Sequence, residues 1–503
     1  MTSKQFLGLI ACAAGLAALG NACVVKTTTT GSGGTTSATS ATNTTGTKMT
    51  TVTGATTSTS TGGGSGHDIN SAMMLTVNDP AGATQGTFVD ATKTHDFYTF
   101  NGTAGERIVI VVQATGATMG ANPAATDPAF SLIGSGKDPS KPLTYQTGGW
   151  PNFQQAAQLF VQLPATGAYY LDLSDCNAFF SMGCPNPAAG VSDLGYAVFV
   201  GDTSKLTAPE NLATAANGTQ ANALPVAYKA TTTAGQYYDA IMGGAFTASS
   251  QTQVFSFKPP ADTMITAGAQ ARAEFYVQPI GGNQGGNLSD TNIKVWITDS
   301  TGKQIAADDQ NNYPTNSTTY TPLEFSVPYV VGSTYYLYVQ NTAAQTASSF
   351  FFIDHYLNPL IDVAEKSTGL NTHNAKASAE ALTAQGTAKD FFTVDGTIAA
   401  VTPNADVDWY SMTVPTGKTQ FQLSCDSARS GSGLGGFNAT LYQTDGTTSF
   451  ATATESATMD LFTPAANIPA AVTAGSTIYL KATASTQDAT NNGSMYRCYV
   501  FFQ

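Results

Sequence analysis

The sequence has 503 residues, with 20 Lys and Arg against 33 Asp and Glu, and a formal net charge of −13. Charged residues make up 11% of the chain and hydrophobic residues 42%, so charge is scarce while apolar content is ordinary. This composition excludes an acidic disordered protein and a coiled coil. Scarce cations also disfavour nucleic acid as a partner, because phosphate contacts need clustered positive charge. The length predicts about three domains.

The start of the chain has the pattern of an export signal. Lys4 supplies a positive charge, and Phe6 to Leu19 is an apolar run too short to span a bilayer. Cleavage after Ala22 would leave Cys23 at the N-terminus, which resembles a bacterial lipoprotein signal, although that family has Leu where this chain has Gly20. The resemblance implies that Cys23 is acylated and that the protein is exported to the cell envelope as an outer-membrane-anchored lipoprotein, at the surface or facing the periplasm. Ordinary secretion with a free N-terminal thiol is the alternative.

A polar segment follows the signal of residues 1–22. Of the 43 residues after Cys23, 33 are Ser, Thr or Gly, and none is aromatic or acidic. Such a segment cannot bury enough apolar surface to offset ordering entropy, so residues 23–66 are predicted to be a disordered tether spanning roughly 35 Å. The rest of the chain carries 17 bases and all 33 acids. An acidic body is repelled by anionic lipid, so only the lipid anchor is expected to contact the membrane.

Six cysteines fit an exported protein. Besides Cys12 in the signal and Cys23, four remain, and an even number in an exported chain predicts two disulfides. Three pairings are formally possible. We favour the one that keeps each bridge inside one domain, which joins Cys176 to Cys184 and Cys425 to Cys498. The spacings lack the close cysteine pairs of zinc sites.

Three sequence patterns recur in the same order in three copies. Copies of the first pattern are 157 and 155 residues apart. The first pattern is His95–Phe100, Thr252–Phe257 and Val407–Met412; the second is Gly167–Leu173, Ser333–Val339 and Ser476–Ala482; the third is Phe130–Gly134, Val295–Gly302 and Ala439–Gly446. Repetition at this period indicates one structural unit used three times.

The repeated patterns alternate with period two and are rich in β-branched and aromatic residues, so they predict strands. In the first copy the alternation places Tyr98 and Phe100 on one face, with Phe97 and Thr99 on the other. The predicted fold is all-β: three tandem antiparallel, jelly-roll-like β-sandwiches, over residues 67–202, 203–360 and 361–503. A brief helix is expected only in the Ala-rich stretch from Ala375 to Leu382.

Each repeat resembles the bacterial pre-peptidase C-terminal domain, a small β-sandwich whose family pattern has an Asp-x-Asp-aromatic-aromatic strand, Asp-x-x-Gly and Gly-x-Tyr-Tyr. The third copy matches best, with Asp406 and Asp408 before Trp409 and Tyr410. The second copy departs most, because it has Gln at both acidic positions. The resemblance implies a β-sandwich that accompanies a peptidase, and this chain contains no peptidase.

Enzyme motifs are missing from the sequence. The four histidines, His67, His95, His355 and His373, form no His-Glu-x-x-His, and there is no Gly-x-Ser-x-Gly elbow, Walker loop or dinucleotide pattern. His95 beside Asp96 could be half of a catalytic triad, but a pair at a strand edge is favoured because the other copies lack the His. We predict that the protein is not an enzyme.

Calcium is the one cofactor hypothesis. Asp406 with Asp408, and Asp308 with Asp309, could supply hard oxygen ligands. The favoured alternative is that these acids cap turns through side-chain hydrogen bonds.

The leading functional hypothesis is adhesion to, or binding of, an extracellular polymer or protein by tandem modules on a stalk, where weak sites gain avidity from high effective concentration. A structural envelope or filament component is one alternative. An accessory subunit of a separate secreted peptidase is another. The sequence does not identify a ligand.

Overall fold

The structure is a computed structural model of the chain. It describes residues 66–79, 82–90, 94–115, 125–147, 156–179, 192–206, 210–228, 238–259, 270–278, 288–289, 291–309, 323–344, 349–358, 365, 372–385, 389–399, 406–427, 431–454, 461–462, 466–487 and 494–503. Cys23, Cys184 and the predicted signal and tether lie outside these residues.

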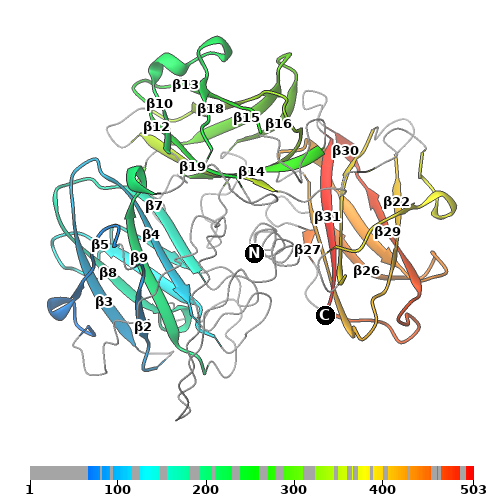
Figure 1. Ribbon diagram of the computed structural model, residues 1–503, viewed down its shortest axis with the longest axis horizontal. Helices are drawn as coiled ribbons and strands as arrows, with labels where there is room; N and C mark the ends of the chain where they lie inside the picture. The colour runs from blue at the N-terminus through cyan, green and yellow to red at the C-terminus, as the bar shows by residue number, and fades with distance from the viewer. Residues whose placement is uncertain are drawn as a thin grey trace, which may run out of the picture.

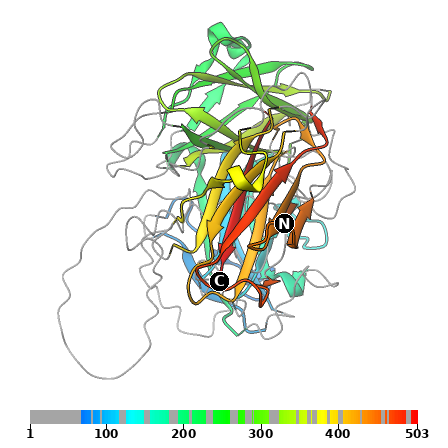
Figure 2. The ribbon, with the colours of Figure 1, turned by 90° about the vertical axis from the view of Figure 1, so that its right-hand side faces the viewer.

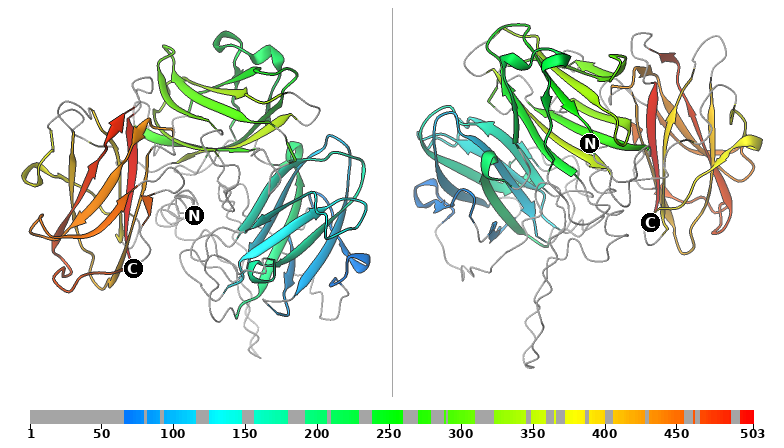
Figure 3. Two further views of the ribbon diagram at one scale, coloured as in Figure 1. Left: turned by 180° about the vertical axis from the view of Figure 1, so that it is seen from behind. Right: turned by 45° about the horizontal axis from the view of Figure 1, so that its top comes forward.

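The chain folds into three β-sandwiches, here called sandwich 1, 2 and 3 in chain order (Figure 1). Each packs a five-stranded sheet, the front sheet, against a second sheet, the back sheet. The second sandwich lies between the other two in Figures 1 and 3, and above them in Figure 2. The predicted all-β fold of three tandem sandwiches is therefore confirmed.

Sandwich 1 has the front sheet order β1-β3-β8-β5-β6 and the back sheet order β2-β9-β4-β7. Its strands are β1 (Met73–Met74), β2 (Thr84–Thr87), β3 (His95–Gly102), β4 (Arg107–Ala114), β5 (Pro128–Ile133), β6 (Thr144–Thr147), β7 (Ala156–Gln162), β8 (Gly167–Asp175) and β9 (Gly195–Asp202). Among the described residues the one α-helix is the single turn α2 (Cys176–Phe179).

Sandwich 2 has the front sheet order β11-β13-β18-β15-β16 and the back sheet order β10-β12-β19-β14-β17. Its strands are β10 (Glu210–Ala213), β11 (Leu224–Pro225), β12 (Tyr238–Ala245), β13 (Thr252–Phe257), β14 (Gln270–Gln278), β15 (Ile293–Asp299), β16 (Gln304–Asp309), β17 (Leu323–Val330), β18 (Tyr335–Asn341) and β19 (Phe350–Asn358).

Sandwich 3 has the front sheet order β20-β22-β29-β25-β26 and the back sheet order β21-β31-β23-β27, with β28 also on β23 and a separate β24-β30 pair. Its strands are β20 (Glu380–Ala381), β21 (Phe391–Thr397), β22 (Asp408–Thr413), β23 (Gln420–Asp426), β24 (Leu434–Gly435), β25 (Asn438–Tyr442), β26 (Ser449–Thr454), β27 (Leu461–Phe462), β28 (Ala466–Asn467), β29 (Thr477–Thr483), β30 (Thr486–Gln487) and β31 (Met495–Phe502).

The three copies share one topology. The first repeated pattern forms β3, β13 and β22; the second forms β8, β18 and β29; the third contributes β5, β15 and β25. Each front sheet begins with a short edge strand (β1, β11 or β20) that pairs in parallel with the first-pattern strand. The sequence repeat is therefore a repeat of whole sandwiches.

Alternation along the strands sorts side chains between core and outer face, as predicted. Tyr98 and Phe100 are fully buried in the main core of sandwich 1. Phe97 instead joins Tyr170 and Ile133 on the outer face of the front sheet. Because β-strands turn successive side chains to opposite faces, one eight-residue strand serves two separate apolar clusters.

A glycine on the back sheet makes room for a large buried ring in two of the sandwiches. A Cβ added at Gly86 would lie 2.3 Å from the ring of Tyr196, and one at Gly396 would lie 2.3 Å from the ring of Tyr496. Each glycine stands directly opposite its tyrosine in the ladder. Gly244 holds the same place in sandwich 2. This glycine is therefore a fourth feature that recurs in all three copies, in addition to the three sequence patterns.

Sandwiches 1 and 2 share an interface. Arg107 on β4 forms a two-pronged ion pair with Glu210 on β10, with N–O distances of 2.6 and 2.7 Å. Beside it lies an apolar cluster from both sandwiches, made of Val109, Val111, Phe160, Ile241, Phe350 and Phe352. The interface between sandwiches 1 and 2 thus contains both an ion pair and an apolar cluster.

The predicted helix from Ala375 to Leu382 is wrong. This stretch forms one 3₁₀ turn, Lys376–Ser378, and then the edge strand β20. Lys376 Nζ donates to the carbonyls of Thr444 and Asp445, which holds the turn against the β25–β26 connection. Tertiary pairing here outweighs the helix propensity of alanine. Within the part of the chain that the structure describes, there is no helix long and apolar enough to cross a membrane.

Candidate functional site

The outer face of the front sheet of sandwich 3 carries an aromatic cluster, here called the platform. It consists of Trp409 on β22, Tyr479 on β29 and Tyr442 on β25. All three alternate with core residues along their strands, and all three are half-buried. The ring centroid of Trp409 lies 5.1 Å from that of Tyr442 and 6.4 Å from that of Tyr479. Neighbouring strands therefore bring together rings that are 33 to 70 residues apart in sequence.

Two lysines sit over the platform. Lys481 Nζ lies 5.6 Å from the centroid of Trp409, and Lys376 Nζ lies 4.9 Å from the centroid of Tyr479. A cation over an aromatic face is attracted by the ring quadrupole. Two threonines continue the row of Trp409 and Lys481 across the sheet, with Thr440 opposite Lys481 and Thr452 opposite Thr440. The face thus combines flat apolar rings, hydroxyls and positive charge.

The outer faces of the other two front sheets differ from the platform. In sandwich 2, Trp296 stacks on Tyr338 with the centroids 4.9 Å apart and the ring planes 7° apart. Both rings are half-buried. In sandwich 1, Phe97 and Tyr170 are each only 8% exposed, under a turn that contains Ile69. The aromatic positions are open in sandwiches 2 and 3 and covered in sandwich 1.

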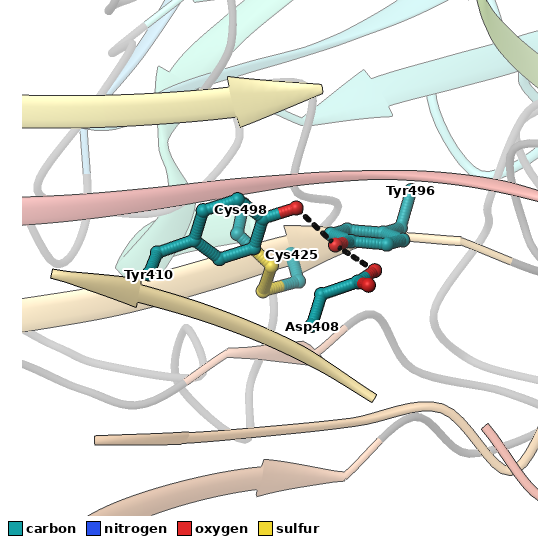
Figure 4. The surroundings of a disulfide bond; sticks show 5 residues. All are labelled: Asp408, Tyr410, Cys425, Tyr496 and Cys498. Carbon is teal, nitrogen blue, oxygen red and sulfur yellow. Dashed lines mark hydrogen bonds between the residues drawn. A yellow bond between two sulfur atoms is a disulfide. The ribbon is translucent and has the colours of Figure 1, made fainter. Parts of the chain in front are cut away.

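A buried polar chain runs through the core of sandwich 3. The hydroxyls of Tyr410 and Tyr496 are hydrogen-bonded, and the Tyr496 hydroxyl donates to Asp408 Oδ2 (Figure 4). All three side chains are at most 1% exposed. Burial, reinforced by the negative charge of Glu365, raises the pKa of Asp408 to about 8.

His373 lies between two buried carboxylates. Its Nε2 is 3.1 Å from Glu365 Oε1 and 3.4 Å from Asp408 Oδ1. The three ligand atoms all lie within 4.8 Å of one another. Among the described residues this His–carboxylate cluster is the only group of three or more His, Cys, Asp or Glu with metal-ligand spacing. Sequence analysis missed it because Glu365 and His373 lie before β20, the first strand of sandwich 3, in a segment here called the join, which is outside the repeated patterns.

Sandwich 1 has a smaller version of the same arrangement. The Tyr196 hydroxyl donates to Asp96 and is hydrogen-bonded to the hydroxyl of Tyr98. His67 Nδ1 lies 2.6 Å from Asp96 Oδ1, but its side chain is 53% exposed. No second carboxylate joins this His and Asp within the described part of the chain.

Sandwich 2 replaces the polar chain with apolar rings. Gln253 stands where the other copies have Asp, and Phe255 and Phe351 stand where they have Tyr. The two phenyl rings keep the edge-to-face contact, with planes at 89°, that Tyr98 and Tyr196 make in sandwich 1.

The two pairs of calcium candidates lie in different sandwiches. Asp308 and Asp309 lie on β16 of sandwich 2, where Asp308 Oδ1 accepts from the Asp309 backbone N–H. Asp406 Oδ2 accepts from the Ala399 backbone N–H, as the turn-capping alternative expects. Asp408 faces a His and a hydroxyl. Calcium at these positions stays a prediction.

One predicted disulfide is confirmed. Cys425 and Cys498 are bonded across neighbouring strands of the back sheet of sandwich 3, 73 residues apart in sequence (Figure 4). Cys176 is buried at the start of α2, but its predicted partner Cys184 lies outside the described residues, as does Cys23. That bridge and the lipidation of Cys23 stay predictions.

The half-triad hypothesis can be compared with the geometry around His95. Its Nδ1 lies 2.7 Å from Asp172 Oδ1 on β8, and this hydrogen bond is the main cause of a raised His95 pKa. Asp96, the neighbour in sequence, points into the core toward Tyr196. The His therefore pairs with an acid on the adjacent strand, on the outer face of the sheet.

No family model matches the chain, and no curated relative matches it. Among solved structures, it is similar to the tandem CBM51 modules of a family 98 glycoside hydrolase from Streptococcus pneumoniae, at 13% identity and TM-score 0.17, over 53% of this chain and 84% of that one. It is also similar to a tandem CBM22 domain from Paenibacillus barcinonensis, at 13% identity and TM-score 0.15, over 55% and 90%. At these values the matches carry no argument about function.

Proposed function

We propose that this chain is an exported, non-catalytic binding protein, held to the cell envelope by a lipid on Cys23, and that its platform binds an extracellular polymer. The observation that supports the binding role most is the set of half-buried rings of Trp409, Tyr442 and Tyr479 on one sheet face. Side chains with few rotatable bonds give contact area at low entropy cost, which is why aromatics dominate recognition surfaces.

The chemistry of the platform favours a polysaccharide. Sugar rings present flat C–H faces that can lie on aromatic rings, and their hydroxyls can pair with threonine hydroxyls and lysine ammonium groups. Lys481 and Lys376 add positive charge to a body that is otherwise strongly acidic. The open Trp296–Tyr338 pair of sandwich 2 offers a second site of the same kind. Two weak sites on one chain would gain avidity on a long polymer.

The experiment is a binding screen with the full mature chain on a glycan array and in pull-downs with insoluble polysaccharides. We expect the wild-type protein to bind at least one polysaccharide. Trp409→Ala should weaken the affinity for that polysaccharide by about tenfold, which corresponds to roughly 1.4 kcal/mol. Trp296→Ala is the matched comparison, because it removes the same kind of ring from the second site, in sandwich 2. Its effect should be smaller and should vanish on short oligosaccharides, which cannot bridge two sites.

Two results would count against this proposal. The first is wild-type protein that binds no polymer on the array. The second is a Trp409→Ala variant that unfolds like the wild type and binds every polymer equally well. Mass spectrometry of the mature N-terminus tests the anchor separately, since acylation of Cys23 adds a fixed mass and an unmodified Cys23 would remove this part of the proposal.

A further inference from the structure

The His–carboxylate cluster of sandwich 3 brings two buried carboxyl groups to one imidazole nitrogen. Glu365 and Asp408 face one imidazole, and the charge of Asp406 also acts on Asp408. The buried guanidinium of Arg497 is held by Asp395 in a two-pronged ion pair. Buried carboxylates are stable when they are paired or coordinate a metal.

Each side chain of the cluster is already fixed by its other polar atom. Glu365 Oε2 accepts from the Thr397 backbone N–H, and Asp408 Oδ2 accepts from the Tyr496 hydroxyl. His373 Nδ1 lies 3.1 Å from Thr372 Oγ1. Metal-binding His and carboxylate side chains are typically oriented by such outer partners. The free oxygen of each carboxylate and His373 Nε2 are thereby aimed at one point.

His373 Nε2 is a second, independent sign of a missing ligand. The side chain is 1% exposed, and Nε2 makes no hydrogen bond of good geometry within the described residues, although two carboxylate oxygens lie beside it. Buried polar nitrogens are normally satisfied. A buried imidazole nitrogen with carboxyl oxygens 3.1 and 3.4 Å away stands where one of three metal ligands would stand.

We propose that Glu365, His373 and Asp408 form a binding site for a zinc-like divalent cation. Ligands at about 2.1 Å from a tetrahedral zinc are about 3.4 Å apart, close to the 3.1 and 3.4 Å that separate Nε2 from the two oxygens. An imidazole ligand favours zinc and its neighbours in the transition series over calcium, which takes six to eight oxygens. The site would tie the join before sandwich 3 to β22.

Sandwich 1 provides the internal control. His67 and Asp96 repeat the His–Asp contact, but the His is largely exposed and no second carboxylate joins them within the described residues. This pair should bind zinc much more weakly. The proposal thus assigns one metal site to one sandwich, and two of its three ligands, Glu365 and His373, lie outside the repeated patterns.

The test uses the full mature chain, stripped of metal with a chelator and titrated with Zn²⁺ alone. We expect one zinc per chain by plasma mass spectrometry, a higher melting temperature, and, with Co²⁺ in place of Zn²⁺, the visible absorption of four-coordinate cobalt. Glu365→Gln and His373→Ala should each weaken binding by about a hundredfold or more, since even loss of an outer partner costs 10–100-fold. His67→Ala should leave stoichiometry and affinity unchanged.

Glu365→Gln keeps the size and the accepting oxygen of the side chain, so it separates a loss of metal from a loss of folding. Wild-type protein that folds but takes up no zinc overturns the proposal, and so does zinc binding that survives both Glu365→Gln and His373→Ala. Uptake of Ca²⁺ in preference to Zn²⁺ would also overturn it. A polymer-binding result does not bear on these outcomes, because the platform lies on the other face of the front sheet.

Discussion

Sandwich 2 and sandwich 3 fill the same position in the fold with different chemistry. In sandwich 3 the ring pair is Tyr410 and Tyr496, and the Tyr496 hydroxyl reaches Asp408. In sandwich 2 the ring pair is Phe255 and Phe351. The glycine opposite the second ring is present in both. The fold therefore requires two large rings and a glycine, and it does not require the buried acid or the hydroxyls.

The polar chain must then be explained by something other than folding. Burying polar groups costs free energy unless every group is paired, and sandwich 2 shows an apolar solution in the same chain. In sandwich 3 the acid of the chain also faces His373 and Glu365. In sandwich 3 the hydrogen bond from Tyr496 also fixes Asp408 beside His373 and Glu365, as the proposed metal site requires.

The disulfide gives the largest predicted difference among the sandwiches. Where sandwich 3 has Cys425 bonded to Cys498, the others have apolar cross-strand pairs, Val112 with Val198 and Val277 with Ile353. Closing a loop of this length should stabilise sandwich 3 by about 4 kcal/mol in the chain-entropy model. Replacing both cysteines with Val should remove that amount, as measured by denaturant unfolding. An unchanged midpoint would show that the bridge is dispensable.

The glycine opposite the ring gives the next effect. Gly396→Ala would place a Cβ 2.3 Å from the fully buried ring of Tyr496 and 2.8 Å from the Tyr410 hydroxyl. Overpacking of this kind costs about 1–3 kcal/mol, measurable as a lower unfolding midpoint of sandwich 3. Gly136→Ala in sandwich 1 is the control for losing a glycine, because a Cβ there meets nothing within 4 Å, and it should leave the unfolding midpoint of sandwich 1 at its wild-type value. A sandwich 3 midpoint that Gly396→Ala leaves at its wild-type value would contradict the steric argument.

The buried Asp–Tyr–Tyr group of sandwich 1 can be converted by mutation to the Gln–Phe–Phe group that sandwich 2 has at the same positions. Tyr196→Phe alone leaves Asp96 Oδ2 and the Tyr98 hydroxyl without the Tyr196 hydroxyl, at a cost of about 1–3 kcal/mol. Adding Asp96→Gln and Tyr98→Phe should recover part of that loss, since the groups left unsatisfied are removed as well. Additive losses in the triple variant would mean that the polar chain is needed by this sandwich.

The smallest effect is the pH dependence that His95 gives to sandwich 1. The hydrogen bond to Asp172 raises the pKa of His95 above its usual 6.5. The folded state therefore binds the proton more tightly, and the stability from this pair is complete below pH 6.5 and is lost as pH rises through the folded pKa. Because His95 is 38% exposed, we expect less than about 1 kcal/mol.

Nuclear magnetic resonance titration of the His95 ring checks this pH dependence. Asp172→Asn should lower the pKa of His95 and flatten the stability profile. Thr252 and Val407 occupy the place of His95 in the other copies and do not titrate in this range. A His95 pKa that does not change in Asp172→Asn would assign the shift to another group.

The repeated part of the fold could be predicted because the alternation of side chains within each strand is visible in the local sequence. Strands such as β3 and β22 alternate so regularly that their inner and outer faces follow from sequence alone. The Cys425–Cys498 bridge could be favoured because each partner falls in the same copy. Among the described residues, the predictions that rest on one repeated unit are thus the ones the structure agrees with.

The candidate sites could not be predicted in the same way. Trp409 and Tyr442 meet only because β22 and β25 flank β29, and this strand order is not visible in the sequence. Glu365 and His373 belong to a join without strand pattern, and only tertiary packing brings them to Asp408. The Ala375–Leu382 prediction failed for the same reason, because a parallel pairing with β22 decides that backbone.

The position of β31 has a consequence for how copies of this protein can associate. β31 is hydrogen-bonded on both sides, to β21 and β23, and the bridge at Cys498 fastens it to β23. A single strand that is hydrogen-bonded on both edges and covalently bonded to its neighbour cannot by itself be exchanged between molecules. Exchange of β31 alone between molecules is therefore closed to the oxidised protein, whereas the matching strands β9 and β19 of the other two sandwiches lack this covalent tie at the same place.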